Sequence, residues 1–187
     1  MKKLSFLLAI LLVGFTAVAQ DFSVNTSKSE IKWTGKKVTG EHWGYVKLKE
    51  GSFKLENNKI VSGSFKVDMT SVTDEDLEDE KWNDKLVGHL KSADFFNIEK
   101  YPVSTLKVVE GAQFKDGKAV VEGELTIKDI TNPVSFIIEK SGNVYTTTVT
   151  VDRTKYNIRY GSGKFFDDLG DNMIYDDFTL DVKIVTQ

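Results

Sequence analysis

Residues 121–138 read VEGELTIKDITNPVSFII, and this stretch decides the fold class. Apolar or small side chains occupy every second position from Val121 to Ile127, and again from Val134 to Ile138. A period of two residues is typical of a β-strand with one buried face. Pro133 is expected at the start of the second strand, where a missing amide does least harm. The stretch therefore predicts two neighbouring antiparallel strands that share one apolar face.

The same alternation recurs along most of the chain. The apolar positions that share a face in each further segment are Ile31 and Trp33; Val46 and Leu48; Phe53 and Leu55; Phe65, Val67 and Met69; Leu106 and Val108; Tyr145, Thr147, Val149 and Val151; and Phe178, Leu180, Val182 and Ile184. Residues 56–59, 115–118 and 141–143 between them are rich in Asn, Asp and Gly, which tolerate the positive φ of tight hairpins. The pattern predicts an all-β fold of eight or slightly more antiparallel strands.

Two segments depart from the strand rhythm. An acidic run, Asp74 to Glu80, leads into a stretch in which Leu86 and Leu90 lie four residues apart, so a short helical excursion is predicted around residues 82–96. Residues 157–172 combine Gly and aromatic residues and are predicted to form a long loop, a type of segment that is often functional.

The composition excludes several function classes. The formal net charge is −3, and Arg153 and Arg159 are the only Arg among 25 basic residues, which argues against nucleic-acid binding. The chain has no Cys, and this excludes disulfides, thiolate metal sites and a cysteine nucleophile.

The first 19 residues have the features of a secretory signal peptide. Lys2 and Lys3 precede an apolar stretch, and the small residues Ala17-Val18-Ala19 follow at the spacing of a cleavage site. The apolar stretch is shorter than the ~18 residues of a membrane span, which argues against a stable membrane anchor. We expect cleavage before Gln20, a single domain over residues 20–187, and a periplasmic or secreted bacterial protein.

The inward-facing side chains leave two architectures open. They are Trp33, Phe65, Val67, Leu125, Ile127, Phe136, Ile138, Val149, Phe178 and Leu180, and all are apolar. In a sandwich or a filled barrel these side chains pack against one another, whereas a barrel of about eight strands also has room for one small ligand. Periodicity alone does not choose between the two.

Four blocks of sequence resemble the YceI-like family of secreted bacterial lipid-binding proteins. They occur in the family's order and are residues 22–33 (with Phe22-Ser23-Val24-Asn25 and Ser29-Glu30-Ile31-Lys32-Trp33), residues 89–102 (His89-Leu90-Lys91-Ser92-Ala93-Asp94-Phe95-Phe96 and Tyr101-Pro102), residues 121–128, and residues 151–161 with Arg153 and Arg159. Asp129 stands where the family commonly has Gly, which affects a turn at a strand end.

The resemblance implies a lipocalin-like β-barrel that binds a polyisoprenoid or another long-chain amphiphile in an apolar cavity. The ten inward-facing residues are then the candidate ligand contacts. His42, Arg153 and Arg159 are candidates for the cavity mouth, where guanidinium suits a phosphate head group. For the two Arg side chains, ion pairs with the abundant Asp and Glu are the alternative. A homodimer is left open.

The residues give little support for catalysis or for a metal site. His42 and His89 are 47 positions apart, without the spacing of a ligand motif, and no Gly-x-Ser-x-Gly elbow occurs. The acidic run and Asp167, Asp168 and Asp171 do not follow the order of a calcium loop and are interpreted as solvated charge. We therefore predict no catalytic residues, no metal and no cofactor, and an exported carrier or sequestering protein. A barrel enzyme acting on a similar apolar substrate is the alternative.

Overall fold

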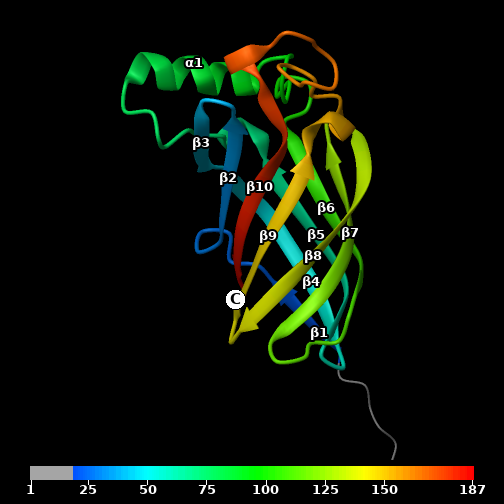
Figure 1. The fold of residues 1–187 in the computed structure, drawn as a ribbon. Helices are drawn as coiled ribbons and strands as arrows, with labels where there is room; N and C mark the ends of the chain where they lie inside the picture. Colours follow the sequence, from blue (N-terminus) through cyan, green and yellow to red (C-terminus); the bar gives the residue numbers. More distant parts are fainter. Residues whose placement is uncertain (1–18) are drawn as a thin grey trace, which may run out of the picture.

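The computed structural model describes residues 19–187, and its strands form one antiparallel sheet (Figure 1). Ten strands belong to this sheet. They are β1 (Ala19–Ser23), β2 (Glu30–Lys37), β3 (Gly40–Tyr45), β4 (Lys47–Glu56), β5 (Lys59–Asp68), β6 (Val103–Gly111), β7 (Lys118–Ile127), β8 (Ile130–Ser141), β9 (Val144–Asp152) and β10 (Ile174–Val185). The predicted all-β antiparallel fold is confirmed. The predicted signal peptide, residues 1–19, lies outside the described residues except for Ala19, which opens β1.

The sheet curls into a barrel that backbone hydrogen bonds close between β4 and β2. In the order β1-β4-β5-β6-β7-β8-β9-β10-β2-β3, neighbouring strands pair with one another. The Val46 N–H, just before β4, donates to the Ile31 carbonyl of β2 at 3.0 Å, and the Asn25 N–H, just after β1, donates to the Val185 carbonyl of β10 at 2.8 Å. These bonds join segments from opposite ends of the sheet order, so the apolar face is enclosed.

The barrel is incomplete between β8 and β9. These strands pair only where Glu139–Ser141 meets residues 144–146, and β9 otherwise pairs with β10. β8 begins at Ile130, so the expected start at Pro133 is wrong. Pro133 lies inside β8, but at a part of the strand that β9 does not reach. A proline at such a local edge costs little, because no second neighbour requires its missing N–H.

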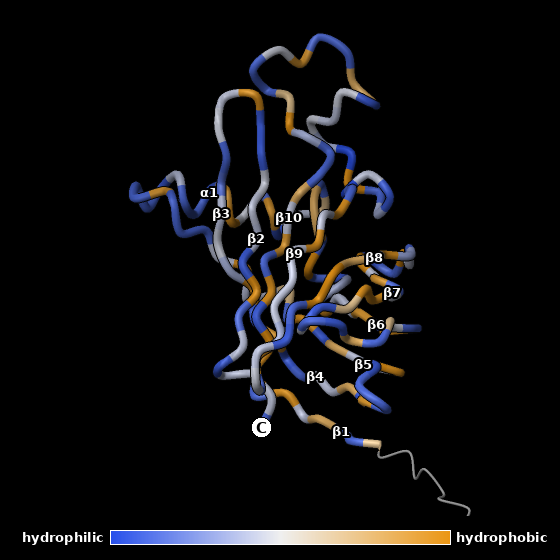
Figure 2. The backbone as a smooth tube through the Cα atoms, turned by 60° about the horizontal axis from the view of Figure 1, so that its bottom comes forward, coloured by the Kyte–Doolittle hydropathy of each residue, from blue (hydrophilic) through white to orange (hydrophobic). Residues whose placement is uncertain are grey.

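The alternation predicted from the sequence sets the two faces of the sheet. Along β7 buried and exposed residues alternate from Lys118 to Glu124, and Val121 is fully buried. Leu125 and Phe136 are buried, whereas Glu124 and Ser135 beside them are exposed. In Figure 2 hydrophobic and hydrophilic stretches follow one another along the strands of the barrel. The apolar side chains therefore gather inside the barrel.

The helix α1 (Glu80–Lys91) lies at one end of the barrel and extends sideways past β3 (Figure 1). Asp79 caps it, because its carboxylate accepts a hydrogen bond from the Trp82 N–H at 3.1 Å. The helix ends at Lys91, earlier than the predicted residue 96, since Ser92 is extended and its hydroxyl donates to the His89 carbonyl at 2.8 Å. Within residues 19–187, no helix is both long enough and apolar enough to cross a bilayer.

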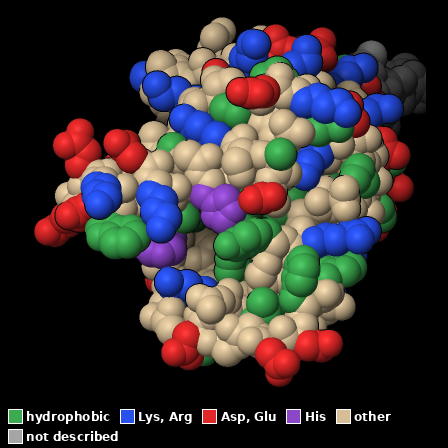
Figure 3. All heavy atoms as spheres, turned by 90° about the horizontal axis from the view of Figure 1, so that it is seen from above, with side chains coloured by type: hydrophobic (Ala, Val, Ile, Leu, Met, Phe, Trp, Pro, Cys, Tyr) green, Lys and Arg blue, Asp and Glu red, His purple; other side chains and the backbone are tan. Residues whose placement is uncertain are grey.

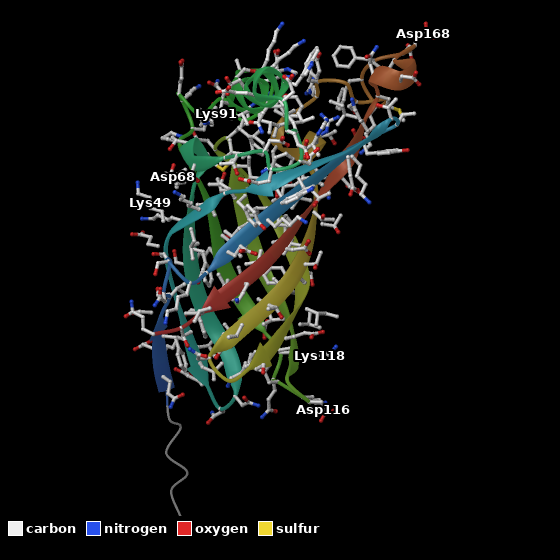
Figure 4. The ribbon with its side chains drawn as sticks, turned by 90° about the vertical axis from the view of Figure 1, so that its left-hand side faces the viewer. Lys49, Asp68, Lys91, Asp116, Lys118 and Asp168 are labelled. Atoms are coloured by element: carbon white, nitrogen blue, oxygen red, sulfur yellow. The ribbon has the colours of Figure 1, made fainter. Side chains whose placement is uncertain are left out.

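The barrel has two different ends, which we call the helix end and the hairpin end. Figure 4 marks the helix end with Lys91 and Asp168 and the hairpin end with Asp116 and Lys118. The helix end carries α1, the short helices η1 (Met69–Ser71), η2 (Arg153–Tyr156) and η3 (Gly170–Asn172), and the loop before β10. The hairpin end carries the turns β4–β5, β6–β7 and β8–β9.

The β7–β8 turn provides a test of backbone strain. Lys128 and Asp129 have φ of 52° and 59°, as a two-residue type I′ turn requires. Asp in place of Gly keeps this turn but holds an L-residue in a left-handed conformation, which costs about 1 kcal/mol. We expect Asp129→Gly to raise the free energy of unfolding by about 0.5–1 kcal/mol in urea denaturation.

The control is Ser135→Gly, at an exposed position of β8 outside the left-handed region. It is expected to lower the unfolding free energy by about 0.5–1 kcal/mol, because Gly weakens a strand interior. Equal or lower stability of Asp129→Gly than of the unchanged protein would contradict the strain argument.

Candidate ligand-binding cavity

The interior of the barrel contains a cavity of about 220 Å³. A single buried water needs only about 10–15 Å³, so the space is far larger than a packing defect. The ten side chains predicted to face inward all line it: Trp33, Phe65, Val67, Leu125, Ile127, Phe136, Ile138, Val149, Phe178 and Leu180. The inward set is thus not packed into a solid core, and the structure selects the hollow barrel.

Aromatic rings close the cavity at the hairpin end. Phe53 and Tyr145 both line it and meet edge to face with their ring centroids 4.9 Å apart. Phe22 of β1 stacks on Phe53 at 5.1 Å. Burial raises the pKa of the Tyr145 phenol, so this hydroxyl remains neutral beside the apolar wall.

Residues from α1 and the turn after it cover the helix end. Leu90, Phe95 and Phe96 line the cavity, and Phe96 lies edge to face with Phe178 at 6.5 Å. His89 lies outside the lining and contacts the Phe95 ring at 4.9 Å, as a packing residue. These contacts place the helical excursion over the barrel interior.

The sequence prediction missed part of the lining. Besides the ten, the apolar wall includes Ile31, Val46, Leu48, Phe53, Ile60, Met69, Val72, Leu90, Phe95, Phe96, Leu106, Val108, Val134, Ile158, Ile174, Val182 and Ile184. Several follow the same two-residue period, so that signal was present in the sequence. Phe95 and Phe96 follow a helix, where no period indicates which side chains reach the cavity.

The cavity meets the surface near the irregular start of β10. Tyr175 and Asp177 are exposed and also line the cavity, in the part of β10 where its register with β2 shifts. Further exposed aromatic residues at the helix end are Trp82, Tyr160, Phe165 and Phe166. Figure 3 looks onto this end, where apolar side chains reach the surface among charged ones. Among the polar residues that line the cavity, Tyr175 and Asp177 are therefore the exposed ones.

The three residues predicted for the mouth have separate positions. Arg153 lines the cavity but is only 4% exposed. His42 does not line the cavity, and its Nδ1 lies 2.9 Å from Asp76 Oδ2. Arg159 is exposed, outside the lining, with its guanidinium 4.7 Å from the Phe165 ring centroid. The structure thus brings only Arg153 to the cavity wall.

Arg153 donates mainly to backbone carbonyls. Neither a phosphate head group nor the ion pairs with Asp and Glu that were the predicted alternative describe its main contacts. Arg153 donates four hydrogen bonds: Nε to Tyr175 O (3.1 Å), one terminal nitrogen to Ile158 O (3.0 Å) and Tyr160 O (2.8 Å), and the other terminal nitrogen to Ile174 O (3.0 Å). Asp176 Oδ1 lies 3.7 Å from the guanidinium. Because four of its five N–H groups are engaged, little of Arg153 remains for a head group.

The charge and the hydrogen bonds of Arg153 link two segments of the helix end. Burial lowers the pKa of its guanidinium, and the charges of Asp176 and Asp152 act in the opposite direction. An arginine nevertheless stays protonated in proteins, so the buried charge needs these partners. The carbonyls belong to the loop after η2 and to the start of β10, two segments that this one side chain joins.

Together, the sheet and the cavity define an extended lipocalin-like barrel. Its strands are antiparallel, its interior is apolar and aromatic rings lie at both of its ends. The chain belongs to the YceI-like family, whose YceI-like domain model matches residues 22–186. The resemblance noted in the sequence is thereby confirmed.

Comparisons with known proteins agree with this assignment. A UPF0312 protein of Vibrio cholerae is 28% identical over 136 residues, which are 68% of this chain and 67% of the relative. The structure of BcnA from Burkholderia cenocepacia has a TM-score of 0.63 at 22% identity, covering 88% of this chain and 99% of BcnA. A polyisoprenoid binding domain from Saccharophagus degradans has a TM-score of 0.58 at 14% identity, covering 89% and 97%. At these identities the structural likeness shows the fold.

The role of Arg153 is testable by a change that keeps the charge. Lysine has three donors on one nitrogen and does not match carbonyls spread around a planar guanidinium. We expect Arg153→Lys to lower the free energy of unfolding by about 2–4 kcal/mol, since it leaves buried carbonyls without a donor. Arg159→Lys, the matched control, is expected to change stability by less than about 1 kcal/mol. Equal effects of the two changes in thermal or urea unfolding would contradict this role.

Proposed function

We propose that this protein binds the apolar chain of a polyisoprenoid or another long-chain amphiphile inside the barrel, as a carrier or sequestering protein. The observation that carries the proposal is the continuous apolar lining of the cavity. Its wall combines aliphatic and aromatic side chains from both sides of the barrel, such as Leu125 and Phe178. The Saccharophagus degradans neighbour, which is named as a polyisoprenoid binding domain, supports the same ligand class.

The energetics of burial support an apolar ligand. Each buried CH₂ contributes about 0.8 kcal/mol, so ten buried carbons contribute roughly 8 kcal/mol before the costs of association. No charged contact is needed for useful affinity. Tyr175 and Asp177 at the surface opening are suitably placed to face a neutral, hydrogen-bonding head group such as an alcohol.

A binding role is favoured over the alternative of an enzyme by what the cavity presents. Neither His42 nor His89 lines it. Tyr145 lines it deep in the barrel with a raised pKa, which disfavours its use as a base. The family assignment points in the same direction, towards binding without turnover.

A pair of lysine substitutions tests the cavity. Leu125→Lys places a cation on the inner face of β7, and its long stem can extend through the cavity with the charge directed towards water. We expect this variant to fold, as judged by circular dichroism and a cooperative melt, and to lose at least tenfold in affinity for farnesol and palmitate. Displacement of a bound fluorescent fatty acid measures that affinity.

Val120→Lys is the matched control, because it makes the same change of charge on the exposed face of the same strand. It is expected to bind both probes as the unchanged protein does. Undiminished binding by a folded Leu125→Lys would contradict a cavity site. Solvent extraction of the natively purified protein, followed by mass spectrometry, would identify the ligand.

We propose further that the protein is exported and acts in the periplasm or outside the cell. The basic start, the apolar stretch and the small residues 17–19 support this location. N-terminal sequencing of the protein recovered from the periplasmic fraction is expected to begin Gln20-Asp21-Phe22. Recovery of a chain that retains Met1 in the membrane fraction would contradict the proposal.

A further inference from the structure

A second cluster of chemically active side chains lies apart from the cavity. His42 comes from β3, and Asp74 and Asp76 come from the segment between η1 and α1. One ligand atom from each residue lies within 4.8 Å of the other two. None of the three lines the barrel interior. We call them the His42 cluster.

The backbone fixes this segment against β3. The Thr73 N–H donates to the Tyr45 carbonyl at 3.0 Å, and the Glu75 N–H donates to the Trp43 carbonyl at 2.9 Å. The approach requires Gly44, because a Cβ there would lie 2.1 Å from the Thr73 carbonyl oxygen. The two carboxylates are therefore brought to His42 by main-chain pairing, independently of any attraction between side chains.

Amide donors orient both carboxylates. Asp76 Oδ1 accepts from the Trp43 N–H at 2.7 Å. Asp74 Oδ1 accepts from the Leu77 N–H at 3.1 Å and from Asn83 Nδ2 at 3.3 Å. Each carboxylate thus has one oxygen held by the protein, an arrangement that resembles the supporting hydrogen bonds of metal ligands.

The second oxygen of Asp74 has no such partner. Asp74 is 5% exposed, and its Oδ2 is buried without a hydrogen bond among the described residues. An unpaired buried carboxylate oxygen is costly, so its presence in a native fold calls for an explanation. The interpretation of the acidic run as solvated charge is therefore wrong for Asp74.

The cluster places two carboxylates beside a single imidazole. Burial and the neighbouring Asp76 carboxylate raise the pKa of Asp74 to about 6. At Asp76 burial acts in the same direction, but hydrogen bonds from the Trp43 N–H and His42 prevail and lower its pKa. Independently of their protonation, the two carboxylates and the imidazole converge within 4.8 Å of one another, so a cation bound between them would have three ligand atoms at hand.

We propose that His42, Asp74 and Asp76 bind one divalent transition-metal ion of the zinc type. One imidazole and two carboxylates are a mixed nitrogen and oxygen set, which suits such ions better than calcium or magnesium, whose sites are built from oxygen ligands. Bonds of about 2.0–2.2 Å in a tetrahedral arrangement place two ligand atoms about 3.3–3.6 Å apart, so ligand atoms that now lie within 4.8 Å of one another would move together by up to about 1.5 Å on binding. The His42 and Asp76 side chains are 25% and 21% exposed, which leaves access for water as a further ligand.

The ion would join β3, at the end of the sheet order, to the segment that leads into α1. That segment includes Val72, which lines the cavity, and the Thr73 carbonyl, which accepts from Trp33 Nε1 at 2.9 Å. Binding at the His42 cluster is thus expected to stabilise the helix end as well. The site itself does not depend on a lipid in the barrel.

Zinc titration of the purified full-length protein, after treatment with EDTA, tests the proposal. Isothermal titration calorimetry is expected to show one Zn²⁺ bound per chain. Millimolar Mg²⁺ or Ca²⁺ is expected not to displace the Zn²⁺. Asp74→Asn and His42→Gln are each expected to lower the Zn²⁺ affinity at least tenfold. Asp74→Asn keeps an oxygen that can accept from the Leu77 N–H, and His42→Gln changes a partly exposed residue. At least one of the two variants is therefore expected to fold, and circular dichroism checks this.

His89→Gln is the matched control. It removes the other imidazole, which lies 3.6 Å from Asp94 and has no third potential ligand among residues 19–187. It is expected to leave Zn²⁺ affinity within twofold. Absence of stoichiometric Zn²⁺ binding, or equal affinity in Asp74→Asn, would overturn the proposal. In that case the carboxyl band of Asp74 in the infrared spectrum at pH 5 would identify a proton shared with Asp76.

Discussion

Burial of the single apolar face of one antiparallel sheet is the constraint on which the rest of the structure depends. Strand pairing aligns the alternate apolar side chains, so Leu125 on β7 lies on the same face as Phe136 on β8. With no second sheet among the described residues to cover this face, it can leave water only if the sheet curls onto itself. The curl brings β2 to β4, where the bond from Val46 to Ile31 completes the enclosure.

The curled sheet encloses a cavity in the middle of the barrel. The two ends of the barrel determine which ligands can enter that cavity. At the hairpin end the Phe53 and Tyr145 rings fill the interior. At the helix end the cover is made from irregular segments, whose backbone groups lack the regular partners of a sheet. Arg153 supplies donors for four carbonyls there. The positive charge of Arg153 is tolerated at the wall of an apolar cavity because its N–H groups are hydrogen-bonded to the carbonyls of the segments that cover this end.

Much of the fold and of the cavity wall could be predicted from the sequence, because a period of two residues indicates both that a segment is a strand and which of its side chains face inward. The ten residues selected in this way, from Trp33 to Leu180, all line the cavity. The helix was also foreseen, but its end at Lys91 depends on the hydroxyl of Ser92, a single local contact. Phe95 and Phe96 have no period to place them, and their contact with the barrel is decided by how the helix end folds back.

The sequence by itself thus determined the strands, their faces and the apolar character of the interior, since these follow from the order of side chains along each strand. Only the tertiary structure decided whether that interior is filled or hollow, because packing depends on volumes summed across many strands. It also decided the roles of the polar residues. Arg153 meets carbonyls of a loop and of a strand that begins 21 positions later, and His42 meets an aspartate 34 positions away. Such contacts join segments that are distant in sequence, and no local pattern of residues encodes them.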